Sequence, residues 1–434
     1  MLRKRIQLGL IHVAVAMTLV PINSTLNRVM IKELGLAATL VAVLASLPYL
    51  LSPVQVAIGS FSDRHPLGGY RRTPYIALGL LLCVLGVILS PQAAFMMSEN
   101  WWAGLGLGAL TFGAWGMGYN FAAVSYLSLA SELSGENGRS RTIAVMFFMM
   151  ILGIISTSIW LSHLLEPYSS QVLEKAFILV GLMALVLGLS GLVKLEERCY
   201  KKPPRREERL PLSGLRRILK ENPQVGLFFW YLILLLAAIL GQDILLEPFA
   251  GEAFNLPVQV TTRITSIWGS CFLLSLLAAA FLENRIPKRK IAVVGALGAI
   301  LAFALIAASG LALSKGIFYA AVVLLGLTTG LATVSNLSLM LDMTVAGKVG
   351  LFIGAWGIAD ALARLAGSVI SGVVRDVVSQ MAHSPVTGYI VVFCLQAGML
   401  VISLVLLNQI DVSEFQRRSE QLSIVERAAI ASEA

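Results

Sequence analysis

The chain has 434 residues, of which 57% are hydrophobic and only 13% are charged. Soluble domains carry about 25% charged residues, so this composition excludes a water-soluble globular protein and predicts a polytopic membrane protein. We attribute its net charge of +9 to loops that face anionic lipid headgroups, and we expect no nucleic-acid partner.

Apolar runs of about 20 residues, the length that crosses a bilayer, occur twelve times along the chain. We place them at 6–31, 35–60, 72–95, 101–130, 140–165, 171–195, 224–248, 258–282, 290–313, 316–342, 347–372 and 386–408. Of the 33 lysines and arginines, 26 fall on the face that would contain both termini, six fall on the opposite face, and Arg364 lies within a run. Positive charge accumulates on the cytoplasmic side of membranes, so both termini are predicted to be cytoplasmic.

A short charged loop separates the second and third runs. It reads Gly59-Ser60-Phe61-Ser62-Asp63-Arg64-His65-Pro66 and then Gly69-Tyr70-Arg71-Arg72-Thr73-Pro74-Tyr75. Glycine permits turns that other residues disfavour, and a carboxylate can accept hydrogen bonds from arginines and from helix N-termini. We therefore predict a cytoplasmic latch between two helices; a loop that is merely basic is the alternative. The predicted latch residues are Gly59, Asp63, Arg64, Arg71 and Arg72.

A charged segment at 196–222, which contains Pro203-Pro204, divides six apolar runs from six. We predict an N-terminal six-helix bundle at 1–195, a cytoplasmic linker at 196–222, a C-terminal six-helix bundle at 223–410 and a cytoplasmic tail at 411–434. A weaker charged motif, Glu283-Asn284-Arg285-Ile286-Pro287-Lys288-Arg289-Lys290, follows the first after about 220 residues. This offset is expected for two parallel repeats.

Polar and charged groups inside two of the runs require partners, because such groups are costly in hydrocarbon. The first run contains Asn27 and Arg28, and the seventh contains Gln242, Asp243 and Glu247. The two runs are equivalent in the two repeats, and helical rise places both clusters toward the non-cytoplasmic end. We predict that Arg28 pairs with Asp243 or Glu247 across the halves as an outer gate. Separate snorkelling of each charge to the headgroups is the alternative.

Two further features are candidates for ligand binding. Asp360 and Arg364, in the eleventh run, are four residues apart and share a helical face, so they can neutralise each other or bind a polar edge of a ligand. His12, in the first run, has the chemistry of a weak candidate ligand for chlorophyll magnesium, although a packed histidine is more usual. The four cysteines have no metal or disulfide spacing, and no hydrolytic or redox motif occurs. We therefore expect neither an enzyme nor a protein-bound metal.

Four stretches of the sequence carry a family resemblance. They are Thr25-Leu26-Asn27-Arg28-Val29-Met30-Ile31, Ser62-Asp63 with Arg71-Arg72-Thr73-Pro74-Tyr75, Gly241-Gln242-Asp243-Ile244-Leu245-Leu246-Glu247-Pro248, and Gly354-Ala355-Trp356-Gly357. Together they resemble the PucC-like, or bacteriochlorophyll delivery, family of the major facilitator superfamily, over essentially the whole chain. The resemblance implies an all-α fold of twelve transmembrane helices arranged as two parallel six-helix repeats.

The resemblance also implies a function. Such proteins assist the assembly of light-harvesting complexes, so the expected partners are antenna polypeptides and the expected ligand is chlorophyll or bacteriochlorophyll. The expected location is a photosynthetic membrane, thylakoid or intracytoplasmic, or the plasma membrane. The alternative is a secondary active transporter, either a cation-coupled symporter or a lipid or pigment flippase, that works by alternating access. For both, the candidate binding or gating residues are Asn27, Arg28, Gln242, Asp243, Glu247, Asp360 and Arg364.

Overall fold

The structure is a computed structural model that describes residues 1–198, 223–282, 285–344 and 349–417. Most of the predicted linker at 196–222 and the end of the tail at 411–434 lie outside these residues. The domain boundaries drawn there therefore stay predictions.

The N-terminal half begins with a helix that changes its geometry within the membrane. Its elements are α1 (Leu2–Val20), the π-helical segments η1 (Pro21–Leu26) and η2 (Val29–Glu33), α2 (Ala38–Ala45), α3 (Leu47–Leu50), α4 (Val54–Arg64), α5 (Thr73–Glu99), α6 (Trp101–Leu164) and α7 (Ser170–Leu192). The C-terminal half consists of α9 (Pro223–Leu240), α10 (Leu246–Phe254), α11 (Val258–Leu282), α12 (Lys288–Ala312), α13 (Lys315–Asp342), α14 (Val349–Ala382) and α15 (Pro385–Gln409).

Ten helices in the described part of the chain are long and apolar enough to cross a membrane. The two other predicted spans are also present. The second span is divided into α2, α3 and α4, with Pro48 and Pro53 at the breaks, where proline removes a backbone donor. The fourth span is the part of α6 that precedes Gly135. At Gly135 φ is +61° and the helical geometry is lost. The protein is an all-α integral membrane protein.

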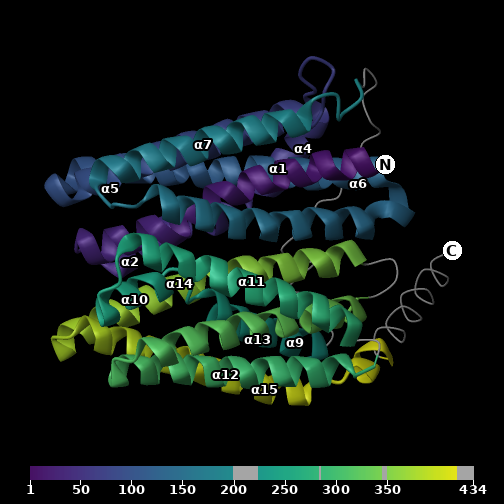
Figure 1. Ribbon diagram of the computed structural model, residues 1–434. Helices are drawn as coiled ribbons and strands as arrows, with labels where there is room; N and C mark the ends of the chain where they lie inside the picture. Colours follow the sequence, from purple (N-terminus) through teal and green to yellow (C-terminus); the bar gives the residue numbers. More distant parts are fainter. Residues whose placement is uncertain (199–222, 283–284, 345–348, 418–434) are drawn as a thin grey trace.

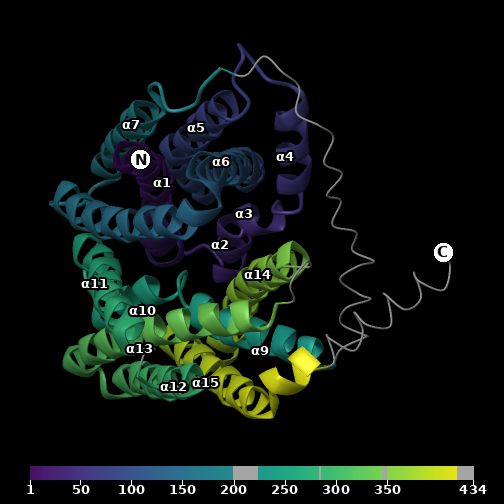
Figure 2. The same cartoon turned by 90° about the vertical axis from the view of Figure 1, so that its right-hand side faces the viewer.

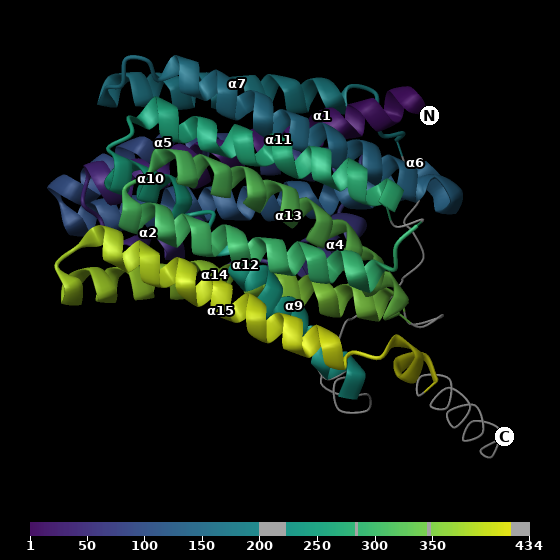
Figure 3. The same cartoon turned by 60° about the horizontal axis from the view of Figure 1, so that its bottom comes forward.

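The two halves lie one against the other, as Figure 1 shows with the N-terminal half above and the C-terminal half below. Viewed along the bundle in Figure 2, α2, α11 and α14 lie along the boundary between them. Figure 3 shows α12 and α15 next to each other in the C-terminal half, where they pack together. The start of α1 and the end of α15 lie on the same side of the molecule (Figure 1). Which side faces the cytoplasm stays a prediction.

Small residues allow α5 and α6 to approach each other closely, as is usual between membrane helices. A Cβ atom at Gly79 would lie 2.5 Å from the backbone nitrogen of Ala122 and 2.7 Å from the carbonyl oxygen of Gly118. Gly113 lies on the same helix as Gly118, but no atom lies within 4 Å of its Cβ position. The glycines of α6 are therefore not equivalent in the packing of the bundle.

Alanine substitution should separate these two classes of glycine. Gly79→Ala forces two helix backbones apart, and we expect a destabilisation of about 1–3 kcal/mol, the usual cost of overpacking. Gly113→Ala should stabilise the protein by up to about 1 kcal/mol, because alanine favours the helix more than glycine does. Thermal unfolding of the two purified variants in the same detergent measures both effects. Melting temperatures that shift equally in the same direction would contradict this packing.

Candidate functional site

The first and seventh spans both lose regular helical geometry where their polar residues occur. The first span is π-helical at Pro21–Leu26 and Val29–Glu33, and the seventh is interrupted by a turn at 241–245 between α9 and α10. Irregular backbone at membrane depth is tolerated where protein covers it or where it lines a polar cavity, and π-helical segments are frequent at functional sites. These breaks make the contact between the halves the candidate functional site.

Glu247 joins the halves through hydroxyl groups. Its Oε2 accepts a hydrogen bond of 2.8 Å from Ser24 of η1, and its Oε1 accepts one of 2.5 Å from Thr265 of α11. The side chain of Glu247 is only 3% exposed. Beside it, the hydroxyls of Thr25 and Thr262 lie 3.0 Å apart across the same boundary.

The predicted ion pair between Arg28 and Asp243 or Glu247 is wrong. Arg28 instead forms an ion pair with Glu33 and donates a 2.9 Å hydrogen bond to the carbonyl oxygen of Leu256. The physical reason is the π-helical geometry, in which residues five apart become neighbours along the helix. Arg28 nevertheless links the two halves, because Leu256 lies between α10 and α11. Snorkelling, the alternative, does not describe a side chain that is 1% exposed.

Other contacts across the boundary continue this arrangement. Lys32 donates to the carbonyl oxygen of Gly251 on α10. Asp376 of α14 accepts hydrogen bonds from the backbone nitrogens of Ala38 and Thr39 at 3.0 and 2.8 Å, and from the Thr39 hydroxyl at 2.7 Å. Helix α2 begins with Ala37 as its N-cap, which has no capping side chain, so the C-terminal half supplies the cap. We call the residues of these contacts the outer clamp: Ser24, Arg28, Lys32, Thr39, Glu247, Thr265 and Asp376.

A second group of polar side chains, the central polar cluster, consists of Tyr49, Gln242, Asp243, Asp360 and Arg364. Arg364 Nε donates to Asp360 at 3.0 Å, as the spacing of four predicts. The Arg364 guanidinium also lies over the ring of Tyr49 in the other half, 5.2 Å from its centroid, and it interacts electrostatically with Asp243. Gln242 donates to Asp243 at 2.6 Å. The side chains of Arg364 and Asp360 are 30% and 42% exposed, so a ligand can reach them.

Two buried amide oxygens near the breaks lack a hydrogen-bond partner among the described residues. They are Asn27 Oδ1 and Gln242 Oε1, on side chains that are 0% and 3% exposed. Buried acceptors are ordinarily satisfied, so each break contains one acceptor whose hydrogen bond the described residues do not supply.

His12, the weak candidate for a pigment ligand, lies in the packed interior of the N-terminal half. Its ring contacts Tyr126 and Phe147 of α6, with centroids 5.0 and 5.1 Å apart, and the residue is 5% exposed. This position favours the packing role and separates His12 from the contact between the halves.

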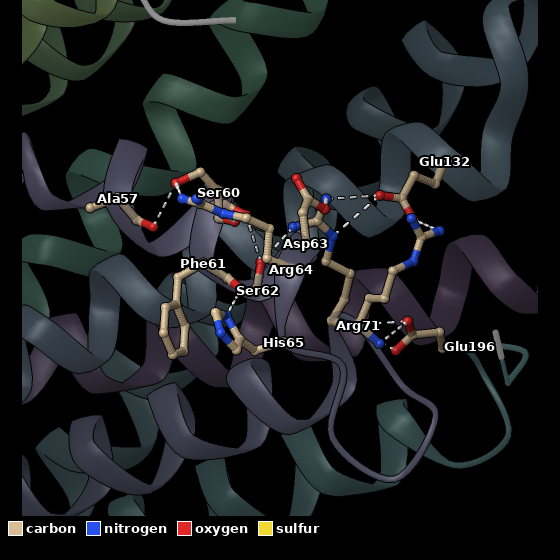
Figure 4. A network of polar contacts seen from close by, with 12 residues as sticks. Ala57, Ser60, Phe61, Ser62, Asp63, Arg64, His65, Arg71, Glu132 and Glu196 are labelled. Carbon is tan, nitrogen blue, oxygen red and sulfur yellow. Dashed lines mark hydrogen bonds and ion pairs between the residues drawn. The ribbon is translucent and has the colours of Figure 1, made fainter. Parts of the chain in front are cut away.

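The predicted latch residues lie at the end of the molecule that contains the start of α1. Asp63 accepts a hydrogen bond of 2.6 Å from Arg72, whose guanidinium also lies 3.0 Å from Glu132 of α6. Arg71 lies 3.5 Å from the same glutamate (Figure 4). Glu196 accepts from the backbone nitrogens of Arg71 and Arg72 and so caps the start of α5. Glu132 and Glu196 lie far from this loop in the sequence, and their contacts with it were not predicted.

Two members of the predicted latch have other roles. Arg64 donates to Ser60 of its own helix, at 3.0 Å to the carbonyl oxygen, and Gly59 lies within α4. The turn depends instead on Gly68 and Gly69, whose φ angles are +61° and +83°. These two predictions are therefore corrected: neither Arg64 nor Gly59 joins the two helices.

The C-terminal half repeats the arrangement of the latch. Lys288, at the start of α12, pairs with Asp342 at the end of α13 at 2.9 Å. Arg72 and Glu132 occupy the matching positions at the start of α5 and the end of the fourth span. The described part of the second charged motif, which begins at Arg285, therefore supports two parallel repeats.

Two six-helix halves with polar contacts at their boundary define a protein with the fold of the major facilitator superfamily. Solved structures with this fold include the nucleoside transporter NupG, with a TM-score of 0.73 and 15% identity over 94% of this chain and 98% of that one. A D-xylose–proton symporter gives a TM-score of 0.71 at 12% identity, over 93% of this chain and 96% of that one. At such low identity the likeness shows the fold alone.

The chain belongs to the PUCC protein family, which matches residues 25–415. A protein of Rhodobacter capsulatus described as "Uncharacterized protein in puhA-bchM intergenic region" is 31% identical over 94% of this chain and 89% of its own length. Protein PucC of Cereibacter sphaeroides is 29% identical over 94% of this chain and 91% of its own length.

The cap that Asp376 places on α2 gives a prediction about the outer clamp. Asp376→Ala removes three hydrogen bonds from one helix N-terminus, and the loss of an N-cap costs about 0.5–2 kcal/mol. Because this cap joins the two halves, we expect them to separate at this end. Pulsed electron paramagnetic resonance would show a longer distance between spin labels at the exposed residues Ser170 and Lys315, after replacement of the native cysteines.

Ser384→Ala is the matched control for this experiment. The Ser384 hydroxyl caps α15 within one half, where it accepts a hydrogen bond from Thr387, so its loss should leave the label distance unchanged. Equal distances in the Asp376→Ala variant and the unsubstituted protein would contradict a clamp that depends on Asp376.

Proposed function

We propose that this protein is a membrane assembly factor for light-harvesting complexes, which binds chlorophyll or bacteriochlorophyll between its halves and delivers it to antenna polypeptides. The observation that carries the proposal is the family match over residues 25–415. This match begins within the break of the first span and includes the whole break of the seventh. It contains the central polar cluster and every residue of the outer clamp except Ser24.

The names of the relatives support a connection with photosynthetic pigment. A 28% identical protein of Rhodobacter capsulatus, matched over 92% of this chain, carries the name "Bacteriochlorophyll synthase 44.5 kDa chain". We propose delivery and not synthesis for the present chain, because the groups at its boundary are suited to hydrogen bonding and ion pairing. The expected partners, antenna polypeptides, follow from the same proposal.

The chemistry of the central polar cluster suits an amphipathic magnesium tetrapyrrole. Such a ligand presents a flat aromatic face, carbonyl acceptors at its edge and a magnesium ion that takes oxygen or nitrogen ligands. Arg364 can donate to an edge carbonyl, and Tyr49 offers an aromatic surface. The unpartnered oxygens of Asn27 and Gln242 are ligands of the type that magnesium prefers.

A secondary active transporter is the second candidate function. Two observations favour it: the fold is that of solved transporters, and Asp243 and Glu247 lie at the boundary where a solute would bind. Binding sites in such proteins occur where membrane helices are interrupted between repeats. Substrate movement that depends on a proton gradient would distinguish this function from assembly.

Affinity purification from the membranes of the native host tests the proposal. We expect the tagged full-length protein, extracted in mild detergent, to co-elute with a magnesium tetrapyrrole and with antenna polypeptides. Arg364→Met should weaken pigment retention at least about tenfold, because a hydrogen bond to a charged group contributes about 1.5–3 kcal/mol. Absorption spectra and mass spectrometry of the eluate measure pigment and partners.

Arg289→Met provides the matched control. Arg289 lies away from the boundary and donates to the carbonyl oxygen of Asn408, so this variant should retain pigment. Equal pigment in the Arg364→Met and Arg289→Met variants would contradict the proposed site. A protein without pigment or partners that moves a solute would support the second candidate.

A further inference from the structure

Glu247 differs from the other acidic side chains at the boundary because its two partners are hydroxyl groups. No residue in the described part of the chain forms an ion pair with it, whereas Asp360 is paired with Arg364. Ser24 and Thr265 hold its two oxygens from different halves, at 2.8 and 2.5 Å. A carboxyl group that is 3% exposed therefore lies in the protein interior without an ion-pair partner among the described residues, and Arg28 acts on it only through a longer-range electrostatic interaction.

The charged groups on the elements packed against α10 have other partners. On the first span, Arg28 binds Glu33 and Leu256 and also interacts electrostatically with Glu247, while Lys32 donates to a backbone carbonyl. On α11, Arg263 donates to Ser162 at 2.7 Å. Helix α15 contains no charged residue. Asp243, on the turn before α10, faces Arg364 and adds negative charge.

Hydroxyl groups can satisfy a carboxyl group in either protonation state. Both hydroxyls donate to an ionised carboxylate, and one of them can rotate to accept the proton of a neutral carboxyl, because a hydroxyl is both donor and acceptor. A lysine or arginine in the same place would stabilise only the ionised form. The bridge between Ser24, Glu247 and Thr265 therefore permits a change of protonation without loss of its hydrogen bonds.

We propose that Glu247 is a proton-binding site that is coupled to the outer clamp. In the closed clamp Glu247 holds a proton, because an unpaired buried carboxylate would cost several kcal/mol. When the halves separate at this end, water reaches the carboxyl group, which releases its proton to solvent. By linkage, acidic conditions favour the closed clamp and alkaline conditions favour its opening. This inference does not depend on which ligand the central polar cluster binds.

Infrared difference spectroscopy of the full-length protein in lipid nanodiscs tests the proton directly. On titration from acidic to alkaline pH, we expect a carboxylic-acid C=O band to disappear in the unsubstituted protein. Glu247→Gln should lack this band, whereas Asp342→Asn, the same change at an acid paired with Lys288 away from the clamp, should retain it. A band that persists in Glu247→Gln would overturn the proposal.

The coupling to the clamp needs a separate measurement. The distance between spin labels at Ser170 and Lys315 should lengthen as pH rises in the unsubstituted protein and should stay short at every pH in Glu247→Gln. The same pH dependence in both proteins would show that Glu247 does not control the clamp.

Thr265→Val keeps the test decisive if Glu247→Gln does not fold. This variant removes one hydrogen bond from Glu247 at nearly constant side-chain shape, so it should shift the frequency of the carboxylic-acid band without abolishing it. An unshifted band would assign the proton to another group and overturn the proposal.

Discussion

The cost of placing polar groups in hydrocarbon governs this structure. A backbone that leaves helical geometry inside a membrane exposes donors and acceptors that lipid cannot satisfy. Here the interruptions at residues 21–33 and 241–245 both lie where the two halves meet. The boundary between the halves is the place where protein groups can satisfy them. The position of the candidate site therefore follows from the same constraint that keeps most of the other spans regular.

The two breaks also explain why the boundary is polar and not sealed by apolar packing. The break in the first span replaces ordinary helical turns with residues that bond to the opposite half, and the chain just after it does the same. Arg28 reaches the carbonyl oxygen of Leu256, and Asp376 caps the unprotected start of α2. Each half thus completes the hydrogen bonding of the other. A contact of this kind fixes how the two halves are aligned, and water can replace its hydrogen bonds when the halves separate.

Much of the fold could be predicted from the sequence because membrane proteins obey few and strong rules. Span length and low charge predicted the helices, and the charged loop with Asp63 and Arg72 predicted an ion pair that the structure contains. The pairing of Asp360 with Arg364 followed from helical spacing. These predictions depend only on local geometry.

The contacts that the sequence did not predict depend on departures from that local geometry. The π-helical segment pairs Arg28 with Glu33, which a regular helix would place on different faces. Asp376 caps a helix that is more than 300 residues away in the chain. Tyr49, which faces Arg364, lies on the short helix that begins at the break beside Pro48. No periodicity in one sequence carries this information.

The two ends of the molecule differ in what their polar groups join, and this difference bears on how the halves can move. At the end with the start of α1, the described networks around Arg72 and Lys288 join helices within one half. At the other end, the outer clamp joins the two halves. An ordinary hydrogen bond contributes about 1 kcal/mol net, because water replaces it when it opens. Water can therefore replace the bonds of the clamp one by one when the halves separate at this end, while the interior of each half stays intact.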